Sequence, residues 1–279
     1  MSTATRVASL ERDGLTFEVF DEGPIDGEVV VLLHGFPERS SCWRDVAPLL
    51  HQAGYRTVAM DQRGYSAGAR PPRRRDYTMS ILAADVSALV ERVGGPVHLV
   101  GHDLGAAVSW VLAIQRPELV RTLTAISVPH PTAYLTSVVT SPQILKSWYI
   151  LFFQLPLLPE LGARRPGPFD RSLRRAGMTP DDVSRFRKEI VGDGAFGPAL
   201  QWYRAFPFAD RTLLRKRVTV PTTLIWSDGD TALTRWSVDK NDKYVDAPYE
   251  LVVLEGVSHW IPSQAPDACA EAILARIAS

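Results

Sequence analysis

Short apolar runs alternate with stretches of helical periodicity from residue 5 to about 131. Residues 28–35 (EVVVLLHG) and 96–101 (PVHLVG) are continuous apolar runs, which are typical of strands in a parallel sheet that is covered on both faces. Ser80 is expected to cap the helix that follows it. This alternation predicts an α/β fold with a mostly parallel central sheet flanked by helices. The other elements expected here are strands at 15–23, 55–61 and 119–129 and helices at 43–54, 81–95 and 104–115.

The alternation stops between residues 132 and 211, where the chain is rich in Pro, Arg and aromatic residues and shows no strong strand pattern. The strand and helix rhythm resumes with apolar runs at 219–230 and 248–259 and closes with a helix at 266–278. We therefore expect a core formed by residues 1–131 and 212–279, with residues 132–211 inserted as a helical cap. The insertion holds 11 Lys or Arg against 7 Asp or Glu, which we interpret as a solvated helical surface.

The composition excludes several classes of protein. With 46% hydrophobic residues the chain can bury a sizeable core, and its formal net charge of zero gives no global attraction to nucleic acid or to anionic membranes. Cys42 and Cys269 are the two cysteines, far apart, so neither a disulfide framework nor a thiolate zinc site is expected. The N-terminal segment lacks the apolar stretch of a signal peptide, and the run Trp148–Pro159 is too short to span a bilayer. We expect a cytoplasmic protein without membrane insertion.

The segment PVHLVGHDLGAAVSW is the richest in chemical information. A buried strand ends near Val100, a helix begins after Asp103, and Gly101 and Gly105 flank that aspartate. This order matches a nucleophile elbow, the tight strand-to-helix turn that presents one side chain from the end of a sheet. The alternative is an ordinary glycine-containing turn between a strand and a helix.

An aspartate at an elbow restricts the reaction. A carboxylate is already nucleophilic at pH 7, but its attack on an ester or amide would give a high-energy anhydride. Attack on a saturated carbon with a strained or good leaving group gives a stable alkyl ester, which water must then hydrolyse. Asp103 therefore favours hydrolysis of epoxides or alkyl halides.

Release of such an ester requires a base and a group that orients it. His259 follows the last apolar run, which places it on a loop at the carboxyl edge of the sheet beside the elbow. Asp228 and Asp230 follow the preceding strand, and we choose Asp230 because it lies deeper in the loop. The order of nucleophile, acid and histidine is that of the α/β-hydrolases. We expect no chemistry from His51, His98 and His102.

The segment HGFPE at 34–38 follows a buried strand and is expected to contribute to an oxyanion hole. The backbone N–H groups of Phe36 and Leu104 are expected to stabilise the oxyanion that forms during ester hydrolysis. Gly35 permits the turn, and Pro37 is expected to fix it, with a cis peptide bond as one way to do so. His34 and Glu38 are expected to brace this loop.

The sequence resembles the α/β-hydrolase-fold epoxide hydrolases in HGFPE at 34–38, in AMDQRGYSAG at 59–68, in GHDLGAAVSW at 101–110, in GDTAL at 229–233 and in GVSHW at 256–260. The resemblance covers nearly the whole chain. It implies that Tyr149, in SWYILFFQLP, and Tyr203, in ALQWYRAF, bind the epoxide oxygen and protonate the leaving alkoxide. Phenols, with a pKa of about 10, can supply that proton. The alternative is that both tyrosines only pack the cap.

The expected activity is conversion of an epoxide to a vicinal diol, with no metal and no organic cofactor. The expected partners are a small lipophilic epoxide and water, and not nucleic acid; a homodimer is left open. A haloalkane dehalogenase and a non-catalytic small-molecule receptor on the same fold are the alternatives. Leu104, where many relatives carry tryptophan, has no side-chain donor for a halide. The expected substrate-pocket residues are His34, Pro37, Trp148, Phe152 and Trp260.

Overall fold

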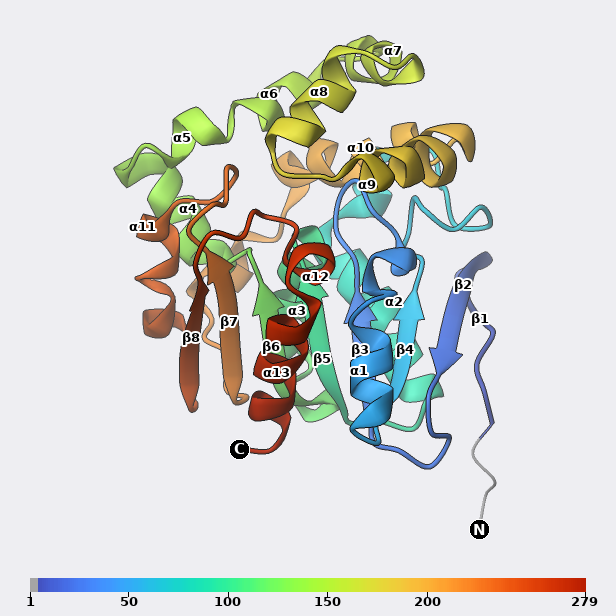
Figure 1. Cartoon of the computed structure of the whole chain (residues 1–279), viewed down its shortest axis with the longest axis vertical. Coiled ribbons are helices and arrows are strands. Elements are labelled where there is room, and N and C mark those ends of the chain that lie inside the picture. Colours follow the sequence, from blue (N-terminus) through green and yellow to red (C-terminus); the bar gives the residue numbers. More distant parts are fainter. Residues whose placement is uncertain (1–4) are drawn as a thin grey trace.

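An eight-stranded sheet forms the centre of the protein in a computed structural model, which describes residues 5–279 (Figure 1). The strand order is β1-β2-β4-β3-β5-β6-β7-β8; β2 is antiparallel to both of its neighbours, and the other neighbouring strands are parallel. This sheet confirms the predicted α/β fold. The strands are β1 (Ser9–Arg12), β2 (Leu15–Glu22), β3 (Val29–Leu33), β4 (Arg56–Met60), β5 (Val97–His102), β6 (Val120–Ile126), β7 (Thr222–Ser227) and β8 (Tyr249–Leu254).

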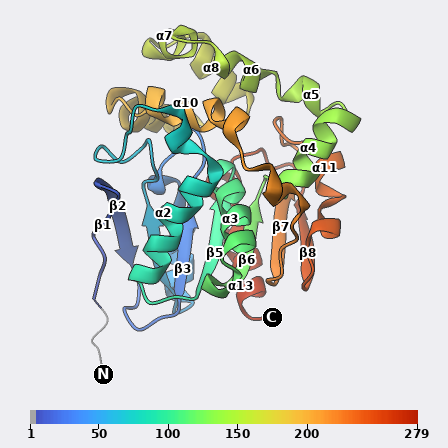
Figure 2. The same ribbon diagram turned by 180° about the vertical axis from the view of Figure 1, so that it is seen from behind.

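Helices cover both faces of the sheet, which explains the continuous apolar strands. In β3, Val31 and Leu33 pack into one buried cluster, whereas Val30 and Leu32 pack into the cluster on the opposite face. Figures 1 and 2 show one pair of helices on each face. The helices are α1 (Ala47–Gln52) and α13 (Pro266–Ile277) on one face, and α2 (Met79–Arg92) and α3 (Leu104–Gln115) on the other.

The segment between β6 and β7 is helical and lies above the carboxyl ends of the parallel strands (Figure 1). It contains no strand, as its sequence pattern predicted. Its main elements are α4 (Pro131–Thr140), α5 (Gln143–Lys146), α6 (Trp148–Gln154), α7 (Leu158–Arg164), α8 (Pro168–Arg175), α9 (Pro180–Arg185), the π-helix η4 (Phe186–Gly192) and α10 (Phe196–Arg204).

Short helices complete the connections. They are α11 (Arg235–Val238), α12 (Ile261–Gln264) and the 3₁₀ turns η1 (Ser40–Trp43), η2 (Arg74–Tyr77), η3 (Pro117–Leu119), η5 (Phe206–Phe208), η6 (Arg211–Arg215) and η7 (Asn241–Tyr244).

The structure corrects two of the predicted element boundaries. The N-cap of α2 is Thr78 rather than Ser80, and Ser80 lies within the first turn of the helix. The helix expected at 43–54 is shorter, because residues 40–43 form a 3₁₀ turn and α1 begins at Ala47. The expectations for the N-terminal segment and for a core that starts at residue 1 lie in part outside the described residues.

Candidate active site

Asp103 stands on a strained turn between β5 and α3. Its backbone has φ 52° and ψ −124°, a conformation that residues other than glycine rarely adopt. A Cβ on Gly101 would overlap the carbonyl oxygen of Gly105, and a Cβ on Gly105 would overlap the carbonyl oxygen of Leu33. Both flanking glycines are therefore required for the close packing of helix and strands at this turn. This geometry is that of a nucleophile elbow.

His259 lies between two carboxylates. Its Nε2 is 3.3 Å from Asp103 Oδ2, and its Nδ1 is 2.8 Å from Asp230 Oδ2. The other oxygen of Asp230 accepts hydrogen bonds from the N–H groups of Ala232 (2.7 Å) and Leu233 (2.8 Å). Asp228 is exposed and accepts a hydrogen bond from the Gly256 N–H instead. The structure thus brings Asp103, His259 and Asp230 together and leaves Asp228 outside the group.

The three side chains are buried, and their charges depend on one another. Burial alone would raise the pKa of Asp103, but the hydrogen bond and charge of His259 hold it below its usual value. Burial alone would lower the pKa of His259, but the charge of Asp230 and hydrogen bonds to both carboxylates hold it well above its usual value. The protonation of His259 and that of Asp103 are therefore coupled.

The backbone N–H of Phe36 donates to Asp103 Oδ1 over 2.9 Å. Phe36 follows β3, and the peptide bond between it and Pro37 is cis, as the sequence allowed. A Cβ on Gly35 would overlap the Asp103 side chain, so only glycine lets this loop approach so closely. Leu104 is the first residue of α3, directly after the elbow. One carboxylate oxygen of Asp103 thus accepts a hydrogen bond from the Phe36 N–H, while the other faces His259.

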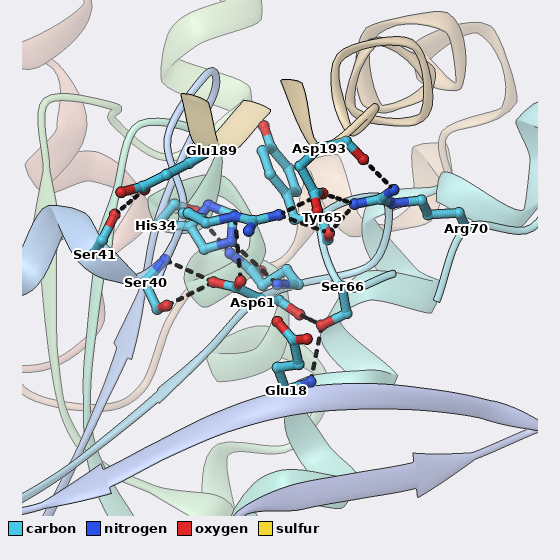
Figure 3. A network of polar contacts seen from close by, with 12 residues as sticks. Glu18, His34, Ser40, Ser41, Asp61, Tyr65, Ser66, Arg70, Glu189 and Asp193 are labelled. Carbon is cyan, nitrogen blue, oxygen red and sulfur yellow. Dashed lines mark hydrogen bonds and ion pairs between the residues drawn. The ribbon is translucent and has the colours of Figure 1, made fainter. Parts of the chain in front are cut away.

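A polar network connects the loop after Phe36 to the loop after β4 and to the helical segment between β6 and β7 (Figure 3). Ser40 donates to Asp61 through its N–H (2.9 Å) and its hydroxyl (2.6 Å). Arg39 donates to the carbonyl of Tyr65 (3.0 Å) and forms an ion pair with Asp193, just after η4 (3.0 Å). Because Asp193 precedes α10, the network connects the loop that carries Phe36 to the helix that carries Tyr203.

Tyr149 on α6 and Tyr203 on α10 meet above the elbow. Their ring centroids are 6.0 Å apart and nearly perpendicular, and both side chains line the same cavities as Asp103. Burial raises the pKa of both phenols well above its usual value, and the Asp103 carboxylate raises it further. Neither hydroxyl donates to another residue in the described part of the chain. Both are therefore neutral donors that face the cavity without a protein acceptor.

Two cavities meet at these three residues. One, of about 200 Å³, is lined mainly by apolar side chains, including Val128, Leu135 and Ile150. The other, of about 410 Å³, extends past His259 toward Trp148 and Trp260. Asp103, Tyr149 and Tyr203 line both.

Three of the five residues predicted for the substrate pocket line the larger cavity: Pro37, Trp148 and Trp260. His34 lines neither cavity. Its ring is fully buried, where Nε2 accepts from the Gln62 N–H (3.1 Å), so it braces the loop, as the sequence also suggested. Phe152 also lies off both cavities, because one residue along a helix turns the side chain by about 100°. Phe153 faces the larger cavity instead.

Sequence reasoning missed the residues that hold the loop after β7, which carries Asp230; we call it the acid loop. Gln143 on α5 is fully buried; its amide donates to the Ala232 carbonyl (2.7 Å) and its oxygen accepts from the Thr234 N–H (2.8 Å). Lys146 donates to the Asp230 carbonyl (2.8 Å). No local motif marks these contacts, because they join segments some 90 residues apart in the chain.

His102, for which we expected no chemistry, contacts the backbone of His259. Its Nε2 lies 2.9 Å from the His259 carbonyl, which also accepts from the Ser127 hydroxyl (3.1 Å). These contacts hold the backbone of the loop that carries His259.

Residues 5–279 contain no group of three or more His, Cys, Asp or Glu side chains arranged to hold a metal ion. Over the same residues no helix combines the length and the apolar character needed to cross a membrane.

Comparison with known proteins shows the family of the chain. Residues 30–272 match the model of the alpha/beta hydrolase family. The chain is 36% identical to the AB hydrolase superfamily protein YfhM of Bacillus subtilis, with 91% of each chain covered. It is 32% identical to Epoxide hydrolase 3 of Xenopus tropicalis, covering 92% of this chain and 73% of that protein.

Solved structures show the same likeness. Epoxide Hydrolase A from Mycobacterium thermoresistibile superposes with a TM-score of 0.81 at 26% identity, over 97% of each chain. An epoxide hydrolase from Vigna radiata gives 0.79 at 27% identity, again over 97% of each chain. The chain belongs to the α/β-hydrolase family, in the group of the epoxide hydrolases.

Proposed function

We propose that this protein is an epoxide hydrolase that forms an aspartyl ester with its substrate and then hydrolyses it to a vicinal diol. One observation carries the proposal: a buried carboxylate on the core and, above it, two phenol hydroxyls without a protein acceptor among the described residues line the same cavities. A nucleophile on one side of a cavity and two acids on the other suit the opening of an epoxide, whose carbon is attacked from the side opposite the ring oxygen while that oxygen takes up a proton.

In the first step Asp103 Oδ2 attacks an epoxide carbon, because Oδ1 is occupied by the Phe36 N–H. A bond forms from Oδ2 to that carbon, and the carbon–oxygen bond of the ring breaks. The leaving oxygen takes a proton from Tyr149 or Tyr203. Oδ1 becomes the carbonyl oxygen of the ester.

In the second step His259 removes a proton from water, which attacks the ester carbonyl carbon. Alkylation of Asp103 removes one of the two negative charges that raise the pKa of the His259 imidazole, so this pKa falls when a base is needed. Asp230 holds the ring with Nε2 toward the site. The Phe36 and Leu104 N–H groups stabilise the oxyanion, which collapses to the free carboxylate and the diol, and the proton taken up by His259 returns to the tyrosine that lost its proton in the first step.

We propose that residues 132–211 act as a cap over a core of residues 1–131 and 212–279, since they carry both tyrosines and roof the cavities. The apolar lining of the smaller cavity favours a lipophilic epoxide. Two buried, unpaired cysteines, Cys42 and Cys269, support a cytoplasmic location.

Diol formation from styrene-type, terminal alkyl and fatty-acid epoxides tests the activity, with Asp103→Ala as the inactive control. Intact mass of His259→Gln after incubation with a reactive epoxide tests the mechanism, and the expected result is a covalent adduct equal in mass to the substrate. Absence of the adduct would count against the aspartyl ester. Faster bromide release from bromoalkanes than epoxide opening would favour a dehalogenase, and tight binding without turnover would favour a receptor.

A further inference from the structure

The outer side of the α5–α7 segment is unusually apolar for a surface exposed to water. Figures 1 and 2 place these helices at the end of the molecule farthest from the amino ends of the parallel strands. Six large apolar side chains between residues 144 and 158 are more than half exposed. We call them the cap face: Ile144, Leu145, Trp148, Leu151, Leu157 and Leu158.

Helix α6 shows how this surface arises. Tyr149 and Phe153, four residues apart, lie on its inner side and line the larger cavity. Trp148 and Leu151, three residues apart, are 62% and 73% exposed on its outer side. A surface helix ordinarily carries polar residues on its outer side, whereas a helix that is apolar all round is ordinarily covered. We therefore expect the outer side of α6 to be buried against a partner in the functional state.

The charges beside the cap face are positive. Between residues 143 and 175 the acids are Glu160 and Asp170, and these form ion pairs with Arg204 and Arg187 from outside that segment. The five arginines of the segment are exposed, and their side chains make no ion pair or hydrogen bond within residues 5–279. They are Arg164, Arg165, Arg171, Arg174 and Arg175. Although the total charge of the chain is zero, these five arginines give the segment a local positive charge.

We propose that the cap face docks onto an anionic phospholipid surface. Leucine and tryptophan side chains would enter the boundary between headgroups and acyl chains, and the arginines would bind lipid phosphates. A second copy of the chain fits less well. A symmetric dimer brings the same patch of both subunits together, so the arginines of one copy would face those of the other.

This surface changes the interpretation of the charge pattern. Neutral total charge and the small basic excess at 132–211 predicted a solvated surface without membrane insertion. Those predictions treated charge as evenly distributed along the segment. In the part of the chain that the structure describes, Glu160 and Asp170 form ion pairs with arginines from outside residues 143–175, and the five arginines of that segment stay unpaired near the cap face. Docking on a surface needs no helix that spans the bilayer.

Trp148 connects this surface to the candidate site. It belongs to the cap face and also lines the cavity that contains Asp103 and His259. A lipophilic epoxide dissolved in the membrane would reach that cavity without crossing water. This delivery role rests on the proposed function, whereas docking itself does not.

Sedimentation of the full-length protein with vesicles tests the proposal, with no substrate present. We expect binding to vesicles of phosphatidylcholine with phosphatidylglycerol, weaker binding to phosphatidylcholine alone, and loss of binding at about 1 M salt. Leu145→Ser with Leu151→Ser should weaken binding by about tenfold or more. Arg171→Glu with Arg174→Glu should do the same on anionic vesicles.

Matched controls place the same chemical changes elsewhere on the surface. Phe20→Ser removes an exposed apolar side chain from β2, and Arg73→Glu with Arg74→Glu reverses two exposed charges outside the segment. Both should bind vesicles as the wild type does. Thermal melting shows that each variant is folded.

Equal vesicle binding by the wild type and the cap-face variants would overturn the proposal, as would absence of binding to any vesicle. A dimer in sedimentation velocity that Leu145→Ser with Leu151→Ser converts to a monomer would also overturn it, because the cover would then be a second copy. Diol formation from a water-soluble epoxide, assayed without vesicles, reports on the proposed function separately.

Discussion

Asp230→Asn should separate the two proposed chemical steps. Asp230 Oδ2 lies 2.8 Å from His259 Nδ1, and the other oxygen accepts two backbone N–H groups that an amide oxygen can still satisfy. The amide NH₂ then faces Nδ1 and donates to it, which moves the ring proton to Nε2. Nε2 can no longer accept a proton from water, while the Asp103 carboxylate stays free to attack.

The size of the effect follows from the lost charge. Opposite charges at the observed 2.8 Å attract by about 4–6 kcal/mol at an effective dielectric constant of about 20. Most of this stabilises the imidazolium that forms as water is deprotonated, so a loss of about 4 kcal/mol corresponds to about 10³-fold in rate. We expect ester hydrolysis to slow by about that factor and ring opening to change by less than about tenfold.

Stopped-flow fluorescence and quenched-flow mass spectrometry measure the two steps in a single turnover. The alkyl-enzyme should accumulate in Asp230→Asn and not in the control Asp228→Asn, whose side chain contacts the Gly256 N–H instead. Equal slowing of both steps in Asp230→Asn, or accumulation in Asp228→Asn, would refute the assignment.

Three further outcomes are expected. Asp103→Asn should lower the pKa of His259, because it removes one of the two carboxylates that raise it, and NMR titration of the imidazole measures this; an unchanged titration would contradict the charge coupling. Tyr203→Phe should slow ring opening by about 10- to 100-fold in single-turnover kinetics, with ester hydrolysis unaffected; an unchanged rate would leave this tyrosine a packing role. Gly105→Ala should destabilise the protein by about 1–3 kcal/mol in thermal melting, because its methyl group would overlap backbone, whereas Gly162→Ala, in open space on α7, should be neutral or stabilising.

The core of the fold could be predicted because each element has a strong local pattern. Helix α3 spans Leu104–Gln115 as expected, since a buried strand, a glycine turn and a small-residue helix follow one another without ambiguity. Strand β1 (Ser9–Arg12) escaped prediction because it lies at the sheet edge and holds one buried apolar residue, Leu10. The start of α2 was wrong because Thr78 and Ser80 are both capable caps.

The candidate site could be predicted only where chain order fixes position. Asp103 and His259 follow strands whose carboxyl ends meet at one edge, so their proximity follows from the fold. The contact of Gln143 with the acid loop depends on how a helical segment packs, which no local pattern encodes. The choice of Phe152 over Phe153 was avoidable, because a residue four positions after Tyr149 shares its helix face.

The meeting of two cavities at Asp103, Tyr149 and Tyr203 has a consequence for adaptation. The proposed nucleophile and proton donors, Asp103, Tyr149 and Tyr203, line both cavities and the proposed base His259 lines the larger one, whereas side chains such as Leu135 and Ile150 line the smaller cavity alone. Substitutions at those positions can change which substituent fits without moving nucleophile, base or proton donors. The chemistry and the substrate preference of this scaffold can therefore diverge independently, and a mutant library confined to one cavity would sample new specificities at constant mechanism.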